Sequence, residues 1–401
     1  MKTFYLGCKI NTNIPNEELF FAIKVYNSNT KKYILDMKPI KLSSSHEAYQ
    51  VFIYQTSVDQ ARKHQVWLYI YRSWHSSEYK LIAYRNIGSL AAFDKPENFK
   101  NLTPMQVNQS KNNNQQVKSA QPIPTVRLVI PRRNIFVTPE YPSESPKDPF
   151  RKSKIEEEFA KRINGETYPN QEGTSLCGPA AYFYCLLKER SDLYIKAVNE
   201  LWEEGQTKIG QLEIKAGDAA KPSNFFKDDG TPRISGIDWI TMGSLRDSEN
   251  LIWDYNDPTK ETAAITAPSN LHDWLKKSGA KNIQNLTTLT SSNLKNLLDI
   301  NEYAKKGYRV VQLMSSQNIF KGKTIPNLKT HWIVWESPLY HATHKQPIHL
   351  QSKLTDIIDL HLFTWGWVGD LTSYRPSVTA NISLQKFLNA SFGAIVFKGI
   401  N

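Results

Sequence analysis

A cysteine opens a strong helical pattern, in the segment QEGTSLCGPAA at residues 171–181. Unsatisfied backbone N–H groups and the helix dipole favour negative charge at a helix N-terminus, so they lower the pKa of a thiol placed there. Pro179 fits the first helical turn, where a missing N–H costs nothing. Cys177 is therefore a candidate nucleophile. Its own N–H and the side-chain amide of Gln171, six residues upstream, are candidate donors to an oxyanion.

A thiolate nucleophile requires a histidine as ion-pair partner and general acid. Of the nine histidines, His331 opens the aromatic and β-branched run THWIVWES at 330–337, which predicts a strand in a sheet. The next predicted strand carries the sequence TWGW at 364–367. We therefore predict that His331 is the partner of Cys177, and that the tryptophans of both strands belong mainly to the core.

Together these residues resemble the papain-like cysteine peptidases: a glutamine six residues before a helix-opening cysteine, a histidine at a strand start and a later Trp-Gly pair. The Cys-Gly-Pro-Ala-Ala form is more similar to bacterial branches, the bacteriocin-leader-processing peptidases and papain-like secreted effectors. The resemblance covers roughly residues 165–400. It implies a papain-like fold, with Cys177 as nucleophile, His331 as general base and acid, and Gln171 as oxyanion donor.

The third catalytic residue departs from the family pattern. Papain-like enzymes place an asparagine two residues before the Trp-Gly pair, and this chain has Phe363 there. Phe363 cannot accept a hydrogen bond from an imidazole. Asp359 and His361 share its strand face by period-two alternation, and a carboxylate would hold the imidazole tautomer. Asp359 is therefore the candidate orienting residue, although it lies roughly 13 Å from position 363 along a strand. The alternative is a Cys–His dyad.

Other chemistry-bearing residues are assigned structural roles. Cys185 lies within an apolar helical pattern and is expected to be a buried, inert thiol. His341, His344 and His349 fall in a polar segment without carboxylate partners, so an exposed loop is favoured over a metal site. Arg246 is expected on a salt-bridged helix face, with substrate contact as the alternative. No cofactor and no metal are predicted.

The elements that must position the site predict an α+β chain in three parts. Residues 1–103 read as an all-β domain for docking or recognition, and residues 104–150 as a flexible Asn/Gln- and Pro-rich linker and arm. Residues 151–401 read as the peptidase domain, with helices packed on an antiparallel sheet. The expected strands are 20–27, 49–56, 66–73, 80–87, 308–314, 330–337, 356–367 and 390–399, and the expected helices are 156–163, 176–190, 191–205, 236–253, 270–280 and 291–307.

Composition restricts the partners and the compartment. The chain has 401 residues and a net charge of +12, but its basic residues are scattered and form no phosphate-binding loop or zinc-finger spacing, so nucleic acid is not the expected partner. Its three cysteines cannot form a disulfide framework. No run is apolar enough for a membrane helix, and MKTFYLGCKINTN is too short for a signal-peptide core.

Two further segments, LWEEGQTKIG (201–210) and DWITMGSLRDSEN (238–250), are similar to papain-like toxin domains that bacterial contact-dependent machines deliver. This similarity implies an antibacterial effector of type VI secretion, cytoplasmic in the producer and exported without the Sec route. The implied partners are a protein substrate in a target cell, a cognate immunity protein, and a secretion-machine carrier or chaperone. Three alternatives to a protease remain open: a papain-like peptidoglycan amidase or endopeptidase, deamidation or acyl transfer by the same Cys–His dyad, and a non-catalytic two-domain binding protein.

Overall fold

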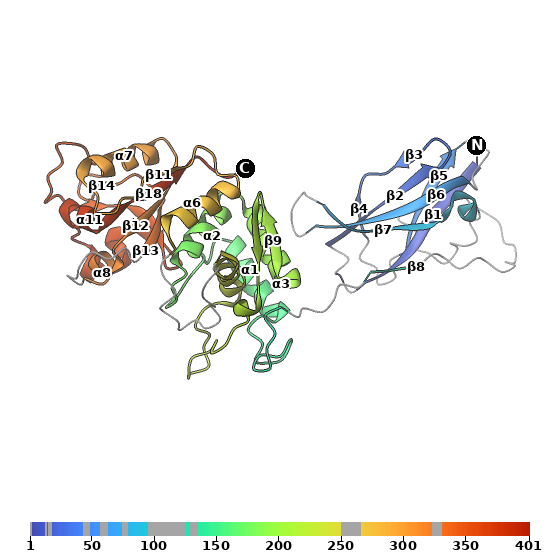
Figure 1. Cartoon of the computed structure of the whole chain (residues 1–401), viewed down its shortest axis with the longest axis horizontal. Helices are drawn as coiled ribbons and strands as arrows, with labels where there is room; N and C mark the ends of the chain where they lie inside the picture. The colour runs from blue at the N-terminus through green and yellow to red at the C-terminus, as the bar shows by residue number, and fades with distance from the viewer. Residues whose placement is uncertain are drawn as a thin grey trace. The chain divides into compact units, whose positions relative to one another are not determined.

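The computed structural model describes residues 2–12, 14, 18–42, 49–56, 63–73, 79–94, 125–128, 135–249, 266–322 and 331–401. It divides the chain into two compact units, Met1–Arg132 and Arg133–Asn401, and Figure 1 shows the elements of each. Together the units have an α+β architecture in which nearly all strand pairs are antiparallel. Among the described residues, no helix combines the length and the apolar character needed to cross a bilayer.

Unit 1 contains two sheets that enclose one core. The first has the strand order β5-β1-β8, and the second the order β3-β2-β6-β7, with β4 pairing with β2. Alternate residues of β6 are buried, as expected for a strand with one face on a core. All four strands predicted for this region are present. The bounds are β1 Lys2–Thr12, β2 Leu19–Asn27, β3 Lys32–Asp36, β4 Ile40–Lys41, β5 Tyr49–Thr56, β6 His64–Arg72, β7 Lys80–Ser89, the 3-10 helix η3 Leu90–Phe93, and β8 Thr125–Leu128.

The boundary predicted at residue 103 is wrong, because β8 belongs to unit 1. Thr125–Leu128 pairs with β1 in parallel, and Val126 is buried in the core of that unit. The first sheet is therefore mixed rather than purely antiparallel. The predicted linker 104–124 lies outside the described residues. The boundary at 150 is also wrong, since Phe136, Tyr141 and Phe150 are buried in the core of unit 2.

The outer face of the second sheet of unit 1 carries aromatic side chains. Tyr69 and Tyr84 stack with ring centroids 5.8 Å apart, and Tyr84 is 53% exposed. The hydroxyl of Tyr33 lies 2.7 Å from that of Tyr69. Lys24, the cation of this cluster, forms an ion pair of 2.7 Å with Asp36. This face is therefore aromatic and accessible, and the charges of Lys24 and Asp36 on it cancel each other.

Unit 2 begins with helices, and their bounds match the predicted ones closely. The helices are α1 Lys152–Ile163, α2 Cys177–Glu189, α3 Ser191–Glu204, α4 Gly236–Asp238, the π-helix η6 Trp239–Gly243, α5 Ser244–Glu249, α6 Pro268–Lys277 and α7 Leu294–Lys305. One continuous helix was expected over 236–253. A π-helical turn interrupts it instead, and residues 250–253 lie outside the described residues. Helix α3 ends at Gly205, which adopts a left-handed conformation.

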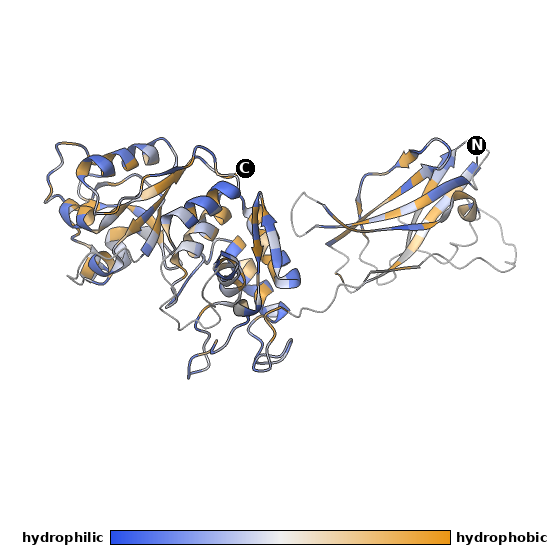
Figure 2. Ribbon diagram, viewed as in Figure 1, coloured by the Kyte–Doolittle hydropathy of each residue, from blue (hydrophilic) through white to orange (hydrophobic). Residues whose placement is uncertain are grey.

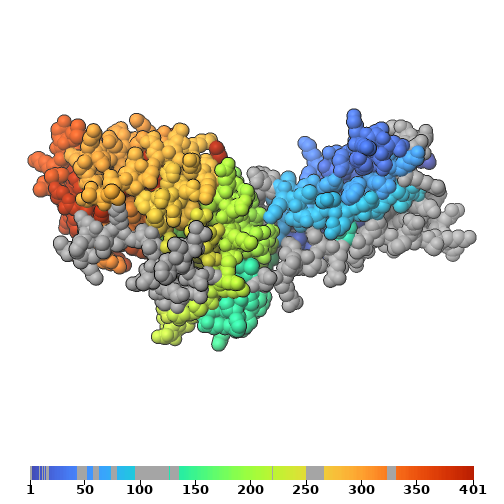
Figure 3. Space-filling model, in the orientation of Figure 1, coloured from blue at the N-terminus to red at the C-terminus, as the bar shows by residue number. Residues whose placement is uncertain are grey.

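A small hairpin packs against the end of α6. It consists of β9 Gln206–Ile209 and β10 Leu212–Lys215, followed by the 3-10 helix η5 Asp218–Ala220. The N–H of Gln211 donates to the carbonyl of Lys277 at 2.7 Å. The yellow-green and gold surfaces of these segments adjoin in Figure 3. Sequence reasoning did not anticipate this hairpin.

The second half of unit 2 forms a six-stranded antiparallel sheet in the order β11-β18-β12-β13-β16-β17. The four predicted strand regions of this half all contribute. The bounds are β11 Gln284–Asn285, β12 Arg309–Met314, α8 Ser316–Phe320, β13 His331–Trp335, β14 Tyr340–His341, β15 Ile358–Asp359, β16 His361–Thr364, β17 Trp367–Asp370, α9 Leu371–Tyr374, α10 Pro376–Thr379, α11 Leu384–Ala390 and β18 Ser391–Phe397.

Both faces of this sheet are covered by apolar cores. Trp332 and Val334 of β13 face the core that contains α2, while Ile333 and Trp335 face a second core with α7 and α11. Figure 2 shows the hydrophobic colouring gathered on the central strands. Burial on both faces explains why these strands read as continuous apolar runs. Helix α2 is buried from Cys177 to Leu186, so it forms the centre of the unit.

Candidate active site

Cys177 is the first residue of α2 and is 3% exposed. The carbonyl of Leu176 accepts the N–H of Ala180 at 2.8 Å, which starts the helix at the cysteine. A Cβ on Gly178 would lie only 2.3 Å from Thr266, so only glycine fits at this position. The predicted helix-opening position of Cys177 is therefore present, and its thiol is enclosed.

The sulfur of Cys177 lies beside the start of β13. It accepts the backbone N–H of Trp332, the residue directly after His331, and those of Gly178 and Cys177 itself. These N–H groups and the charge of Arg246 favour the thiolate, but burial outweighs them and raises the pKa of Cys177 to about 11. The prediction of a lowered thiol pKa is therefore wrong for this enclosed state.

His331 is 2% exposed and is held on two sides. Its Nε2 lies 2.8 Å from the hydroxyl oxygen of Thr364. Its ring stacks on Trp365 with centroids 3.7 Å apart and planes 8° apart, and Phe320 approaches it edge-on. Burial, with a smaller effect of the Lys321 charge, lowers the pKa of His331 to about 3. The imidazole is therefore neutral in this state and fixed in orientation.

Thr364, rather than Asp359, contacts the imidazole. The carboxylate of Asp359 is buried, accepts from the N–H and hydroxyl of Thr372 at 3.1 and 2.9 Å, and contacts Lys345. Asp359 is engaged there, so the prediction that it orients His331 is wrong. Phe363 stacks on Tyr184 at 3.9 Å in the core. The orienting position is thus shifted by one residue.

Strand register explains this shift. Strands β13 and β16 pair antiparallel, with Val334 opposite Phe363. Extending that register places Thr364 opposite Ile333, on the face that also carries His331, because side chains alternate. A one-residue change of register exchanges the two faces of a strand. The hydroxyl beside the Trp-Gly pair was the signal in the sequence, but only the register identifies it.

Gln171 lies in a closed loop that approaches the same strands. Its carbonyl accepts the N–H and hydroxyl of Thr174, at 3.0 and 2.6 Å. Gln171 is 7% exposed, and its buried Oε1 has no hydrogen-bond partner among the residues that the structure describes. Rotating the carboxamide by 180° exchanges oxygen and nitrogen, so a donor can occupy that place without backbone movement. The neighbouring residue Asn170 packs closely on Gly366. A Cβ added to Gly366 would lie 2.6 Å from the Cβ of Asn170.

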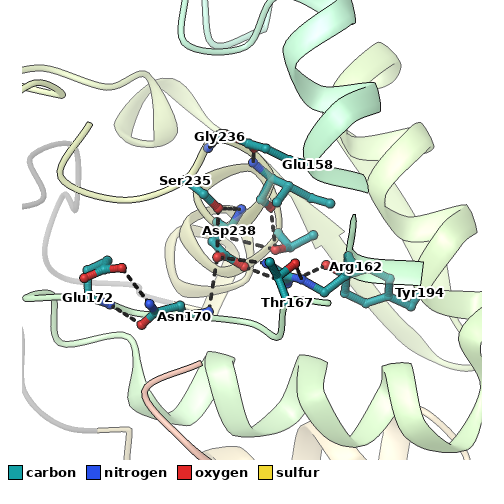
Figure 4. Close-up of polar contacts among 11 residues, drawn as sticks. Glu158, Arg162, Thr167, Asn170, Glu172, Tyr194, Ser235, Gly236 and Asp238 are labelled. Atoms are coloured by element: carbon teal, nitrogen blue, oxygen red, sulfur yellow. Dashed lines mark hydrogen bonds and ion pairs between the residues drawn. The ribbon is translucent and has the colours of Figure 1, made fainter. Parts of the chain in front are cut away.

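A buried ion pair anchors this loop, as Figure 4 shows. Arg162 of α1 donates to both carboxylate oxygens of Asp238, at 2.9 and 3.1 Å, and also to the hydroxyl of Tyr194 at 3.0 Å. Asp238 accepts the N–H of Asn170 at 3.1 Å. The side chain of Asn170 donates in turn to Glu172 at 2.6 Å. Sequence reasoning missed this network, because its members are far apart in the chain.

A cleft of about 360 Å³ opens beside these residues. Two of its lining residues, Glu172 and Trp365, have positive φ angles of 50° and 41°. Such backbone strain in residues other than glycine is typical of functional sites. The lining residues are Asn170, Glu172, Phe320, Lys321, Trp365, Tyr374 and Arg375.

The remaining sequence candidates lie elsewhere. Cys185 is fully buried, as expected. His341 is buried and bonds to Ser352, which corrects its assignment to an exposed loop, whereas His344 and His349 are exposed. In the described parts of the chain, no three His, Cys, Asp or Glu side chains are grouped to hold a metal.

Arg246 is also buried rather than on a solvated helix face. It is 6% exposed, and its charge acts on Cys177. Its neighbour Asp247 accepts the N–H of Gly217 at 2.6 Å. The structure therefore brings the Cys177 sulfur, Arg246 and the backbone at the start of β13 together, whereas the ring of His331 contacts Thr364, Trp365 and Phe320.

Comparisons with known proteins add no assignment. No family model, no curated protein and no solved structure matches the chain.

Proposed function

We propose that unit 2 is a cysteine peptidase with a papain-like arrangement of catalytic groups. One observation carries this proposal: the sulfur of a helix-opening cysteine accepts the N–H of the residue that follows His331. The neighbouring strand supplies Thr364 and Trp365 to fix the imidazole. A nucleophile, a base and an orienting group from three elements are the parts that thiol-based acyl transfer needs.

The reaction would begin with transfer of the Cys177 proton to His331 as sulfur attacks the peptide carbonyl carbon. Both groups are neutral at pH 7 in the enclosed state, so proton transfer accompanies attack. The N–H of Cys177 and the amide of Gln171 would stabilise the oxyanion. The imidazolium protonates the leaving amine as the C–N bond breaks, which leaves a thioester. His331 then takes a proton from a water molecule as the water oxygen attacks the thioester carbon. The C–S bond breaks, the acyl group leaves as a carboxylic acid, and His331 returns the proton to the sulfur of Cys177.

A search for new protein N-termini tests this function. The full chain and its Cys177→Ala variant would be expressed separately inside bacteria. We expect new N-termini, and growth arrest, only with the unchanged chain. Unchanged N-termini together with altered muropeptides from purified peptidoglycan would instead support the amidase alternative, which the net charge of +12 would suit through anionic wall polymers. Identical results for the unchanged chain and the Cys177→Ala variant would favour the remaining alternative, a non-catalytic binding protein.

Thr364→Val is expected to lower kcat/KM about tenfold to a hundredfold, because it leaves Nε2 of His331 buried without a partner. Thr364→Ser keeps the hydroxyl and should restore most of the activity. The pH–rate profile should change in the valine variant alone. A valine variant with normal kcat/KM and a normal profile would remove Thr364 from the mechanism.

We propose that unit 1 recognises a protein partner during delivery of an antibacterial effector. The aromatic face described above supports this role, because tyrosine and tryptophan are the residue types that dominate binding energy at protein interfaces. Trp67 belongs to this face as well, with its ring centroid 6.0 Å from that of Tyr84. The double variant Trp67→Ala/Tyr84→Ala should remain toxic when made inside the target cell but lose at least tenfold in killing between cells. Exposed Lys295→Ala on α7 serves as the matched control. Equal losses in both assays would contradict a delivery role.

A further inference from the structure

The cleft beside the candidate active site has an aromatic wall. Phe320 and Trp365 meet edge-on with ring centroids 5.2 Å apart, and Tyr374 lies 5.3 Å from Phe320. Helix α8, the turn after β16 and helix α9 supply these three rings. Asn170 and Glu172 also line the cleft and flank Gln171 directly in the chain.

The chemistry determines which part of a substrate this cleft can receive. The imidazole of His331 must deliver its proton to the leaving amine, so the chain that follows the scissile bond lies on the imidazole side. Trp365 stacks on that imidazole and also lines the cleft. The cleft is therefore placed to receive the first residue after the scissile bond.

The charged residues that line the cleft indicate which kind of side chain it can bind. Lys321 and Arg375 line it and are exposed, and the guanidinium of Arg375 lies 5.5 Å from the ring centroid of Tyr374. The one acidic lining residue, Glu172, is already engaged by the side-chain amide of Asn170 at 2.6 Å. The cleft is therefore lined by two cationic side chains and one carboxylate, and the carboxylate already accepts a hydrogen bond.

We propose that this cleft binds the residue after the scissile bond and selects an acidic side chain there, through Lys321 and Arg375. The inference rests on the proposed peptidase function and extends it to a substrate class. The aromatic wall would pack against the aliphatic part of the substrate side chain, while its carboxylate pairs with the two cations.

The position of Lys321 links this selection to the chemistry. Its charge makes protonation of His331 less favourable. A substrate carboxylate paired with Lys321 offsets that charge, so the imidazolium needed for amine release forms more easily. An acidic substrate would then raise kcat as well as lower KM, whereas a simple binding pocket would change KM alone.

The test uses the full chain and a peptide taken from a cleavage site found by the N-terminus search. Three versions would carry Glu, Gln or Lys directly after the scissile bond. We expect kcat/KM for Glu to exceed that for Gln at least tenfold and that for Lys at least a hundredfold. The variant Lys321→Glu/Arg375→Glu should prefer Lys instead. The control Lys295→Glu makes a charge change on exposed α7 and should keep the preference for Glu.

Three outcomes would overturn this inference, and they differ in whether the proposed peptidase function fails with it. Cleavage of all three peptides at equal rates, abolished by Cys177→Ala, would overturn the acidic selectivity and leave the peptidase intact. No Cys177-dependent cleavage of any peptide, or of any protein in the N-terminus search, would overturn both. A preference for Glu that persists in the charge-reversed variant would also overturn the inference, because the selectivity would then arise outside this cleft.

Discussion

Replacing Cys177 by alanine is expected to lower kcat/KM at least a thousandfold. The change removes the sulfur that forms the thioester in the proposed reaction, so the proposed oxyanion donors would have no intermediate to stabilise. Purified protein and a cleaved peptide would supply the measurement, with circular dichroism to confirm the fold. Although the side chain is buried, the change removes a single heavy atom, so the loss of stability should be small compared with the loss of activity.

Cys185→Ala is the matched control, since this second thiol of α2 is also buried and lies in the same helix. It should keep wild-type kcat/KM within a few fold. Equal activity losses in the two variants would point to helix packing rather than catalysis and would contradict the role of Cys177.

The reaction of Cys177 with iodoacetamide should depend strongly on pH. With a pKa of about 11, the thiolate fraction at pH 7 is about one in ten thousand and rises tenfold per pH unit up to the pKa. Burial raises the pKa of Cys185 still further, so its labelling should be slower at every pH. Mass spectrometry of the labelled peptide would give both rates. Labelling of Cys177 that is already fast at pH 7 and does not change with pH would contradict the raised pKa of an enclosed thiol.

Asp238→Asn is expected to destabilise unit 2 by about 3–5 kcal/mol, because it leaves the buried guanidinium of Arg162 without its counter-charge. Urea unfolding followed by hydrogen-exchange mass spectrometry would report unit 2 separately from unit 1. The exposed ion pair of Asp218 with Lys221 provides the control. Asp218→Asn should change the stability of unit 2 little, because solvent screens this exposed pair. Similar losses in both variants would contradict the anchoring role of Asp238.

A second variant separates stability from positioning of the Gln171 loop. The apolar replacement Arg162→Met/Asp238→Leu removes both charges, which should recover much of the lost stability. It still deprives the N–H of Asn170 of its acceptor. We therefore expect kcat/KM to stay at least tenfold below wild type despite the recovered fold. Full recovery of activity would show that the ion pair contributes stability alone.

The helices and strands of unit 2 could be predicted because their apolar residues repeat at regular spacing. The pattern of α2 gave both the helix and the position of Cys177 at its first residue. The apolar run after His331 gave β13, since a strand buried on both faces is continuously hydrophobic. The spacing of apolar residues was therefore sufficient to predict the helices and strands, and to place Cys177 and His331 at the first residues of theirs.

Residues that act across elements could not be predicted in the same way. Thr364 meets His331 only because β13 and β16 pair in one register, and Asp359, four residues from Phe363, has its own partners. The Arg162–Asp238 pair joins helices that are 76 residues apart in the chain. Neither pairing leaves a periodic trace in the sequence.

The amino-acid sequence by itself determined the order of helices and strands in unit 2 and the positions of Cys177 and His331 at the start of their elements. Both depend on hydrophobic spacing and on the residues that begin and end each helix and strand, which act over a few positions. Tertiary structure decided the partner of the imidazole, the anchoring of the Gln171 loop and the pKa of the thiol, because strand register and desolvation arise only when distant segments pack together.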